Sequence, residues 1–218
     1  MPRKYKRKFQ RKRRYNVGSA LSTASKALTV AYGIKKLLNV ERKYHDGAVD
    51  GGSANSTMVI NTLTTIPQCD TANPRDGYSL KLQNLAWRLF IKQNASATTP
   101  TQVRVMIVQG LDDTAASQAF LLESTGSAPL DMRNIYYTNE LKVLYDKVLN
   151  VGPNGSASAG VYRNGFIKRF PSEHLTFDQA DTAGTSIRKG ALFMCIIGDN
   201  ATNAPSYDFT YRIRYVDN

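Results

Sequence analysis

From about residue 57 to the C-terminus, apolar and polar side chains tend to alternate with a period of two. Successive side chains of a β-strand point to opposite faces, so this alternation predicts strands with one face buried. The clearest case is the last, where five apolar or aromatic residues alternate with polar ones: Tyr207, Phe209, Tyr211, Ile213 and Tyr215. In all, the pattern predicts eight strands, over residues 57–66, 79–93, 102–110, 140–151, 161–170, 174–178, 191–198 and 207–215.

Two of these stretches predict finer detail. In 79–93 the alternation slips by one residue between Leu82 and Leu85, which predicts a β-bulge near Asn84, and it then places Trp87 in the core. The run ALFMCIIG (191–198) is apolar throughout, as expected of a central strand covered on both faces. Its Cys195 is predicted to be a small buried apolar residue, because the chain has only two cysteines and no disulfide framework.

Eight strand candidates, loops of moderate length and no second long helical pattern predict an all-β fold. An eight-stranded antiparallel jelly-roll sandwich matches this strand count. An immunoglobulin-like sandwich and a barrel remain alternatives at this point. About 175 residues suit a single domain of this kind, large enough to fold without metal or disulfide staples. We assign this domain to residues 44–218.

A different pattern precedes the strands. Apolar residues recur near the helical period between Leu21 and Leu38, which predicts a short amphipathic helix over 19–39 with Ser19 or Ser22 as N-cap. The helix is expected to lie against the body or a neighbour; a membrane-active basic helix is the alternative, although its apolar face is mostly alanine. Residues 45–57 are rich in Gly and Asp and predict a linker.

Charge separates the chain into two parts. Residues 1–43 carry fourteen Lys and Arg against one acid, a net charge of +13, whereas residues 44–218 carry fifteen against sixteen, a net charge of −1. Like charges repel and bury nothing, so the basic N-terminal arm (residues 1–43) is expected to need a polyanion to neutralise it. The predicted nucleic-acid-binding residues are Arg3, Lys4, Tyr5, Lys6, Arg7, Lys8, Arg11, Lys12, Arg13, Arg14, Lys26, Lys35 and Lys36.

Lys and Arg displace the counterions of phosphate, so binding by the arm is expected to weaken steeply with salt and to carry no sequence information. Tyr5, Phe9 and Tyr15 are interleaved with the charges and suit stacking on unpaired bases. A basic run of this kind also predicts a nuclear localisation signal, and the two roles are compatible at different times.

Catalysis finds little support in the sequence. The two histidines, His45 and His174, lie far apart without the spacing of metal ligands, and neither a phosphate-binding loop nor a nucleophile elbow occurs. The pair Asp112 and Asp113 predicts a solvated loop rather than a cation site. We therefore expect no enzyme activity, no cofactor and no metal. The chain also lacks a run of about 20 apolar residues and a signal-peptide pattern, so an intracellular, soluble protein without stable membrane association is expected.

Four stretches together resemble a known family. They are the basic aromatic start, PRDGYSLKLQNLAWRLFI (74–91), ELKVLYDKVLNV (140–151) and the C-terminal ALFMCIIGDNATNAPSYDFTYRIRYVDN (191–218). Their order and spacing are similar to those of the single jelly-roll capsid proteins of small circular single-stranded DNA viruses, whose shell domain is similar to the satellite tobacco necrosis virus coat protein. The resemblance implies a closed icosahedral shell, of the smallest T=1 class, with the arm inside on the genome.

The charge separation together with this resemblance implies a capsid protein that assembles into a shell of about 60 copies and packages single-stranded DNA through its arm. A host nuclear import receptor is a further expected partner, and the virion and the host nucleus are the expected locations. A chromatin-like or movement protein that binds nucleic acid without forming a shell is the first alternative, and would show base-reading residues on the folded body. A jelly-roll protein that binds a receptor or glycan is the second, and would normally require export.

Overall fold

The computed structural model describes residues 25–30, 42–68, 75–123, 128–178 and 183–217. The chain divides into two units, Met1–Val40 and Glu41–Asn218. In the first unit, residues 25–30 form a helix whose side chains are exposed, and the Thr29 hydroxyl donates to the Ser25 carbonyl at 2.9 Å. The remainder of the predicted helix over 19–39 lies outside the described residues.

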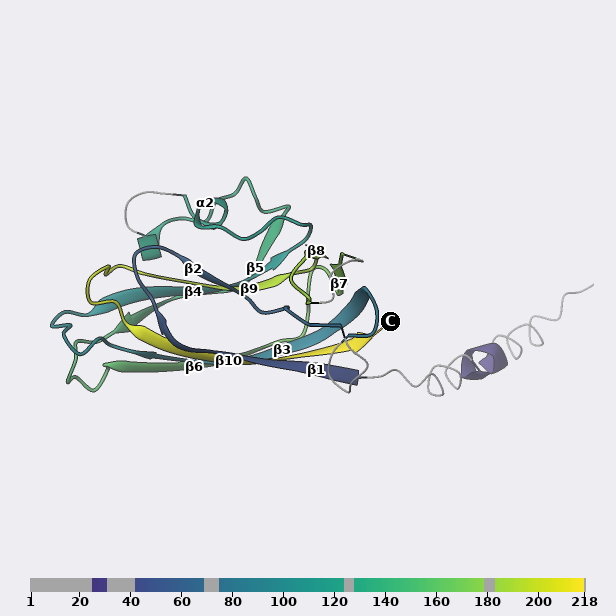
Figure 1. Cartoon of the computed structure of the whole chain (residues 1–218), viewed down its shortest axis with the longest axis horizontal. Helices are drawn as coiled ribbons and strands as arrows, with labels where there is room; N and C mark the ends of the chain where they lie inside the picture. Colours follow the sequence, from purple (N-terminus) through teal and green to yellow (C-terminus); the bar gives the residue numbers. More distant parts are fainter. Residues whose placement is uncertain (1–24, 31–41, 69–74, 124–127, 179–182, 218) are drawn as a thin grey trace, which may run out of the picture. The chain divides into compact units, whose positions relative to one another are not determined.

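The second unit is built from antiparallel strands in two layers (Figure 1). Its short helical pieces, α2 (Gln118–Leu121) and a 3₁₀ turn at Ala128–Leu130, both lie between the fourth and fifth strands. The strands are β1 (Arg42–Ser53), β2 (Val59–Thr62), β3 (Ser79–Lys92), β4 (Thr101–Gly110), β5 (Leu141–Val151), β6 (Gly160–Ile167), β7 (His174–Phe177), β8 (Ile187–Lys189), β9 (Leu192–Gly198) and β10 (Ser206–Asp217).

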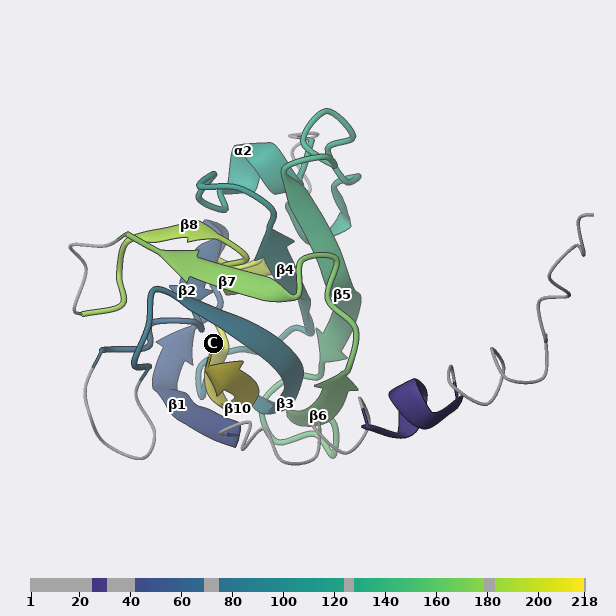
Figure 2. The ribbon, with the colours of Figure 1, turned by 90° about the vertical axis from the view of Figure 1, so that its right-hand side faces the viewer.

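The strand order is that of a jelly roll. The larger sheet runs β1-β10-β3-β6 and the smaller sheet β2-β9-β4-β5, so the first and last strands pair and successive strands mostly change sheets (Figure 2). Eight strands in two Greek keys define this architecture. The predicted all-β jelly-roll sandwich is confirmed. Strands β7 and β8 extend the larger sheet, since β7 pairs with the first residues of β3 and β8 pairs with β7.

The predicted linker over 45–57 is wrong for most of its length, because β1 spans Arg42–Ser53 and pairs with β10. Its glycines, which suggested a linker, allow this pairing. A Cβ atom on Gly47 would overlap the ring of Tyr211, and one on Gly52 would overlap the ring of Tyr207. Glycine in a strand often marks such a close approach. The glycines therefore make room for aromatic rings of the neighbouring strand.

The predicted bulge in the third strand is confirmed. Arg214 of β10 lies opposite Asn84, but the next residue, Tyr215, lies opposite Leu82, so Gln83 is the extra residue. The bulge changes the phase of the alternation by one residue. As a result, Leu82 and Leu85 are both buried on the core side of the sheet despite their odd spacing.

The smaller sheet is covered on both faces. One face packs against the larger sheet, and the other packs against α2 and the residues around it, through Leu121 and Leu122 on Met106 and Cys195. Every residue of β9 is buried, which confirms the prediction from its continuous apolar run. Burial also raises the pKa of the Cys195 thiol to about 12, so this thiol stays protonated. Cys69 lies outside the described residues.

Two buried arginines fix the long connections. The Arg75 side chain is fully buried, donates to the carbonyls of Ile66 and Gly77, and stacks 4.0 Å from the Phe177 ring centre. Arg104 forms two hydrogen bonds with Asp146, at 2.8 and 2.7 Å, and also reaches the chain at Pro129 and Asp131. Bidentate arginine pairs of this kind restrict geometry strongly. These contacts anchor the described parts of the β2–β3 and β4–β5 connections.

Trp87→Ala is expected to lower the free energy of unfolding by about 3–5 kcal/mol. The indole is 3% exposed and lies between the sheets, with ring centroids 4.8 Å from Tyr145 and 6.2 Å from Phe209. Urea unfolding followed by far-UV circular dichroism measures the loss. Phe90→Ala on the same strand, where the ring is 40% exposed, is the control and should cost less than about 1.5 kcal/mol. Equal losses in the two variants would contradict this account of the core.

Candidate nucleic-acid interface

Of the basic residues predicted to bind nucleic acid, only Lys26 lies in the described part of the chain, where it is exposed on the 25–30 helix. Arg3, Lys4, Lys6, Arg7, Lys8, Arg11, Lys12, Arg13, Arg14, Lys35 and Lys36, together with Tyr5, lie outside it. Asp112 and Asp113 are exposed after β4, and the Asp112 carboxylate accepts a hydrogen bond from the Thr114 amide. Among the described residues, no group of three or more His, Cys, Asp or Glu is arranged to hold a metal.

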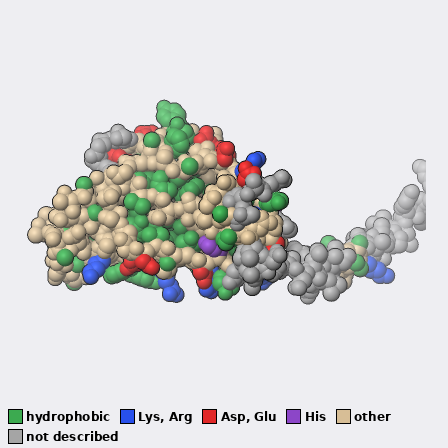
Figure 3. All heavy atoms as spheres, in the orientation of Figure 1, with side chains coloured by type: hydrophobic (Ala, Val, Ile, Leu, Met, Phe, Trp, Pro, Cys, Tyr) green, Lys and Arg blue, Asp and Glu red, His purple; other side chains and the backbone are tan. Residues whose placement is uncertain are grey.

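The outer face of the larger sheet gathers a second set of basic and aromatic residues, from four strands that are far apart in sequence. The register sets their order across the sheet. Residues paired across the strands form rows. In one row Arg212 of β10 lies between Asp46 of β1 and Ala86 of β3, and Phe166 of β6 follows Ala86. In the next row Arg88 of β3 lies between Thr210 of β10 and Asn164 of β6. In Figure 3, Lys and Arg side chains project from the lower edge of the body, where the larger sheet lies.

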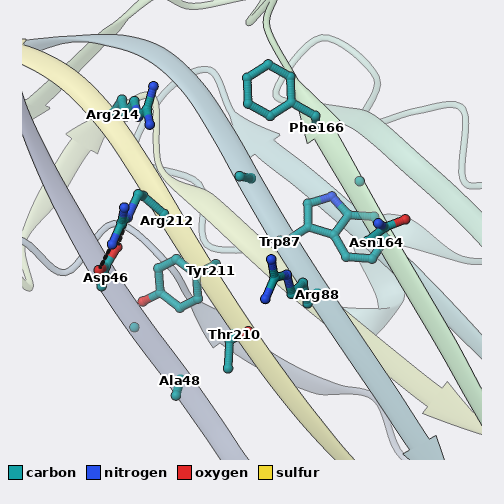
Figure 4. A pocket seen from close by; sticks show the side chains of 13 residues that line it. Asp46, Ala48, Trp87, Arg88, Asn164, Phe166, Thr210, Tyr211, Arg212 and Arg214 are labelled. Carbon is teal, nitrogen blue, oxygen red and sulfur yellow. Dashed lines mark hydrogen bonds and ion pairs between the residues drawn. The ribbon is translucent and has the colours of Figure 1, made fainter.

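The middle of this face is hollowed into a groove of about 1040 Å³, which we call the sheet groove. Its lining contains three arginines and one aspartate, a net charge of +2. Figure 4 shows the arginines rising from β3 and β10, with Phe166 across from them on β6. The polar and aromatic side chains that line it include Arg88, Asn164, Phe166, Thr210, Arg212 and Arg214.

The single acid of the groove is already paired. Arg212 donates two hydrogen bonds to Asp46, both 2.6 Å long, and this pairing lowers the pKa of the Asp46 carboxyl. The Arg212 guanidinium also lies 4.7 Å from the centre of the Tyr44 ring. By contrast, Arg88 and Arg214 form no ion pair with any described residue. Two positive charges of the groove are thus left for an external anion.

Aromatic rings flank the groove. Tyr44, Phe90, Tyr162 and Phe166 all point outward from the larger sheet and are between 40 and 53% exposed. Phe90 and Tyr162 lie opposite each other on β3 and β6. Exposed rings beside positive charges provide flat apolar surfaces within reach of an anion.

At two glycines of the groove floor, an aromatic ring from the neighbouring strand packs directly against the backbone. A Cβ atom on Gly165 would overlap the indole of Trp87, and Gly47 covers the ring of Tyr211 in the same way. Trp87 and Tyr211 therefore close the sheet from beneath, and burial raises the pKa of the Tyr211 hydroxyl. Ala48 and Ala86 also line the groove, and their side chains are short, so a planar group has room to lie against the sheet.

Some residues of the sheet groove could be predicted from the sequence to point outward. The alternation in the last strand already separates Arg212 and Arg214 from the apolar side. The contribution of β6 was missed because Tyr162 and Phe166 acquire a meaning only once β6 is known to pair with β3. Asp46 was missed because its strand was assigned to a linker.

Comparison with known proteins gives a likeness of fold alone. No protein-family model matches the chain, and no curated protein matches it. Turnip yellow mosaic virus has a similar structure with a TM-score of 0.39 and 12% identity, covering 82% of each chain. The structure of tobacco necrosis virus has a TM-score of 0.37 and 14% sequence identity, and the match covers 81% of this chain and 83% of that chain. The dimeric latent PorU of Porphyromonas gingivalis has a TM-score of 0.34 and 10% sequence identity, and the match covers 80% of this chain but 13% of that chain. At these scores the likeness carries no argument about function.

In the described ranges, no helix is both long and apolar enough to cross a membrane.

His45 gives the fold a defined pH dependence. Burial in β1 lowers the pKa of its imidazole below the usual 6.5, although the nearby Asp46 charge acts in the opposite direction. The unfolded chain therefore binds the proton more readily, and stability is complete above pH 6.5 and falls as the pH drops toward the folded-state pKa. We expect His45→Gln to reduce this loss between pH 7.5 and 5.5. Thermal unfolding at both values measures it, with exposed His174→Gln as the control; identical slopes in all three proteins would contradict the assignment.

Proposed function

We propose that this chain is a viral capsid protein, whose folded body assembles into a shell and whose basic arm packages single-stranded DNA. The observation that carries the proposal is the separation of charge on a jelly-roll protein. Residues 1–40 contain twelve Lys and Arg and no acid, whereas residues 41–218 contain seventeen of each sign. The whole net charge of +12 thus belongs to the first forty residues.

This separation suits a packaging shell. Neutral bodies pack side by side without mutual repulsion, whereas a uniformly basic protein would resist it. About 60 arms with about +12 each in residues 1–40 supply on the order of 700 positive charges against packaged phosphate, in a closed shell of the smallest class. The role is structural, with no catalytic step assigned to any residue.

Exposed apolar side chains on the β4–β5 connection support contacts between copies. Leu130, Met132, Ile135 and Tyr136 are between 58 and 82% exposed, and Figure 3 shows apolar side chains protruding at the top of the body, where this connection lies. We call these four residues the apolar knob. Arg104 and Arg133 both bind Asp146 and hold the connection beneath the knob. Exposed large apolar side chains gathered on one connection are typical of a protein interface.

The same basic arm serves as a nuclear localisation signal in this proposal. A run of Lys and Arg is recognised by import receptors before assembly, when no DNA covers it. The host nucleus and the virion are the corresponding locations, and the host import receptor is a transient partner.

A nucleic-acid-binding protein that forms no shell is the second candidate. The sheet groove favours it, because its net charge of +2 and its exposed rings place potential ligand-binding groups on the folded body. Electron microscopy of the purified protein, with the absorbance ratio at 260 and 280 nm before and after nuclease, separates the two. Uniform shells that protect nucleic acid support the capsid, and a small species that binds DNA contradicts it.

Deleting residues 2–15 removes nine of the twelve positive charges of the first unit. We expect the body to fold normally, because β1 begins only at Arg42, and the nucleic acid protected from nuclease to fall at least several-fold. Circular dichroism and the absorbance ratio of purified particles measure these two results. An unchanged nucleic-acid content would contradict the role of the arm.

Met132→Ser combined with Tyr136→Ser should raise the protein concentration needed for assembly at least tenfold, or prevent assembly. The reason is that the apolar contacts these side chains bury between copies are lost. The melting temperature should stay within a few degrees, because both side chains are exposed. Light scattering against concentration measures assembly. Tyr78→Ser, which removes a 43% exposed ring elsewhere, is the control. Equal assembly of the double variant and the unaltered protein would exclude the apolar knob as a contact.

A further inference from the structure

We propose that the sheet groove binds the unpaired bases of a single-stranded nucleic acid, in addition to the phosphate neutralisation by the arm. The identity of the polymer as a packaged genome rests on the proposed function. The groove itself is an observation on the body, formed by β1, β10, β3 and β6. The groove is locally positive, with a net charge of +2, although residues 44–218 together carry a net charge of −1.

Charge selects an anionic occupant. Arg88 and Arg214 lie in the groove without an ion pair to any described residue, and Arg212 is paired with the only acid of the lining. The chain's own arm, at about +13, is repelled by this surface. The same face of a second copy is repelled too, because it would bring three arginines against three. A polyanion remains as the partner that the electrostatics favour.

The aromatic rings select unpaired bases. Phe166 borders the groove on β6 in the same row as Arg212. Phe90 and Tyr162 lie one row beyond Arg88, about 6.7 Å further along the strands. Rings therefore lie on both sides of Arg88. Bases of a duplex are stacked on each other and cannot lie flat on these rings. Bases of a single strand can, while the neighbouring arginines contact the phosphates.

The groove floor suits this mode. Ala48, Ala86 and Thr210 are small, so a base placed beside Phe166 approaches the sheet without obstruction. The Thr210 hydroxyl and the Asn164 amide lie on either side of Arg88 and offer hydrogen bonds to base edges (Figure 4). The smaller sheet differs, because α2 and the described residues around it pack on the outward side chains of β4 and β9.

The test is photo-crosslinking of the full-length protein to a thymidine-rich oligonucleotide that carries 5-bromodeoxyuridine, with the crosslinked peptides identified by mass spectrometry. Working at about 0.5 M salt suppresses the phosphate contacts of the arm more than stacking. We expect crosslinks on peptides that contain Phe90, Tyr162 or Phe166. The same oligonucleotide annealed to its complement should give at least tenfold fewer of them.

Two variants sharpen the test. Phe166→Ala should lower the affinity for the single strand at this salt about tenfold. Arg88→Ala combined with Arg214→Ala should lower it by a similar factor. Tyr78→Ala and Lys147→Ala remove an exposed ring and an exposed charge outside the groove and should change it less than twofold. All four sets of side chains are at least partly exposed, so unchanged melting temperatures verify that folding is intact.

The outcomes separate this proposal from the capsid function. Crosslinks confined to residues 1–43, or body crosslinks that persist unchanged in Phe166→Ala, would overturn the groove as a binding surface, even if shells with protected DNA form. Groove crosslinks in a protein that forms no shell would support the groove and reject the capsid. Groove crosslinks of equal yield with duplex DNA would overturn the selection of unpaired bases.

Discussion

The body depends on the position of its last strand. β10 pairs with β1 along one edge and with β3 along the other, so the larger sheet exists only when the C-terminal residues have joined the first strand of the domain. Its inward side chains, among them Phe209 and Ile213, are fully buried in the core. Its outward side chains include Arg212 and Arg214 of the groove. A single alternating sequence thus supplies both core side chains and the arginines that line the sheet groove.

The two sheets differ in what covers them. The chain uses α2 and the long β4–β5 connection to bury the outer face of the smaller sheet, and this makes β4 and β9 apolar on both sides. The larger sheet keeps polar, basic and aromatic side chains outward, with no described segment over them. The two layers therefore differ in exposure: the smaller sheet adds to the core on both faces, and the larger sheet carries the sheet groove on its open face.

Local pattern was sufficient for most of the fold. The alternation in β3 and β10, the bulge at Gln83 and the apolar run of β9 all depend on neighbours in the sequence, and the structure agrees with each. β1 was mistaken for a linker because its glycines become favourable only against the rings of β10. The groove was beyond sequence reasoning for a similar reason, since Phe166 and Arg212 meet only through the pairing of three strands. The arm stays a prediction from its contiguous charge, because most of it lies outside the described residues.

The end of β1 nearest the arm is also the end at which the domain closes. The Lys43 ammonium is buried and binds Asp76 at 2.7 Å and Asp217 at 3.4 Å, and the Asp76 amide donates to the same Asp217 carboxylate. Burial alone would lower the pKa of Lys43, but these carboxylates raise it, so the clamp stays charged. Under the proposed function, tension from a nucleic acid bound to the arm would reach the β1–β10 pairing first at Arg42 and Val216. The clamp ties that pair to two further segments, because Lys43 joins β1 to Asp76 ahead of β3 and to Asp217 at the end of β10, so separating β1 would also require breaking a buried ion pair.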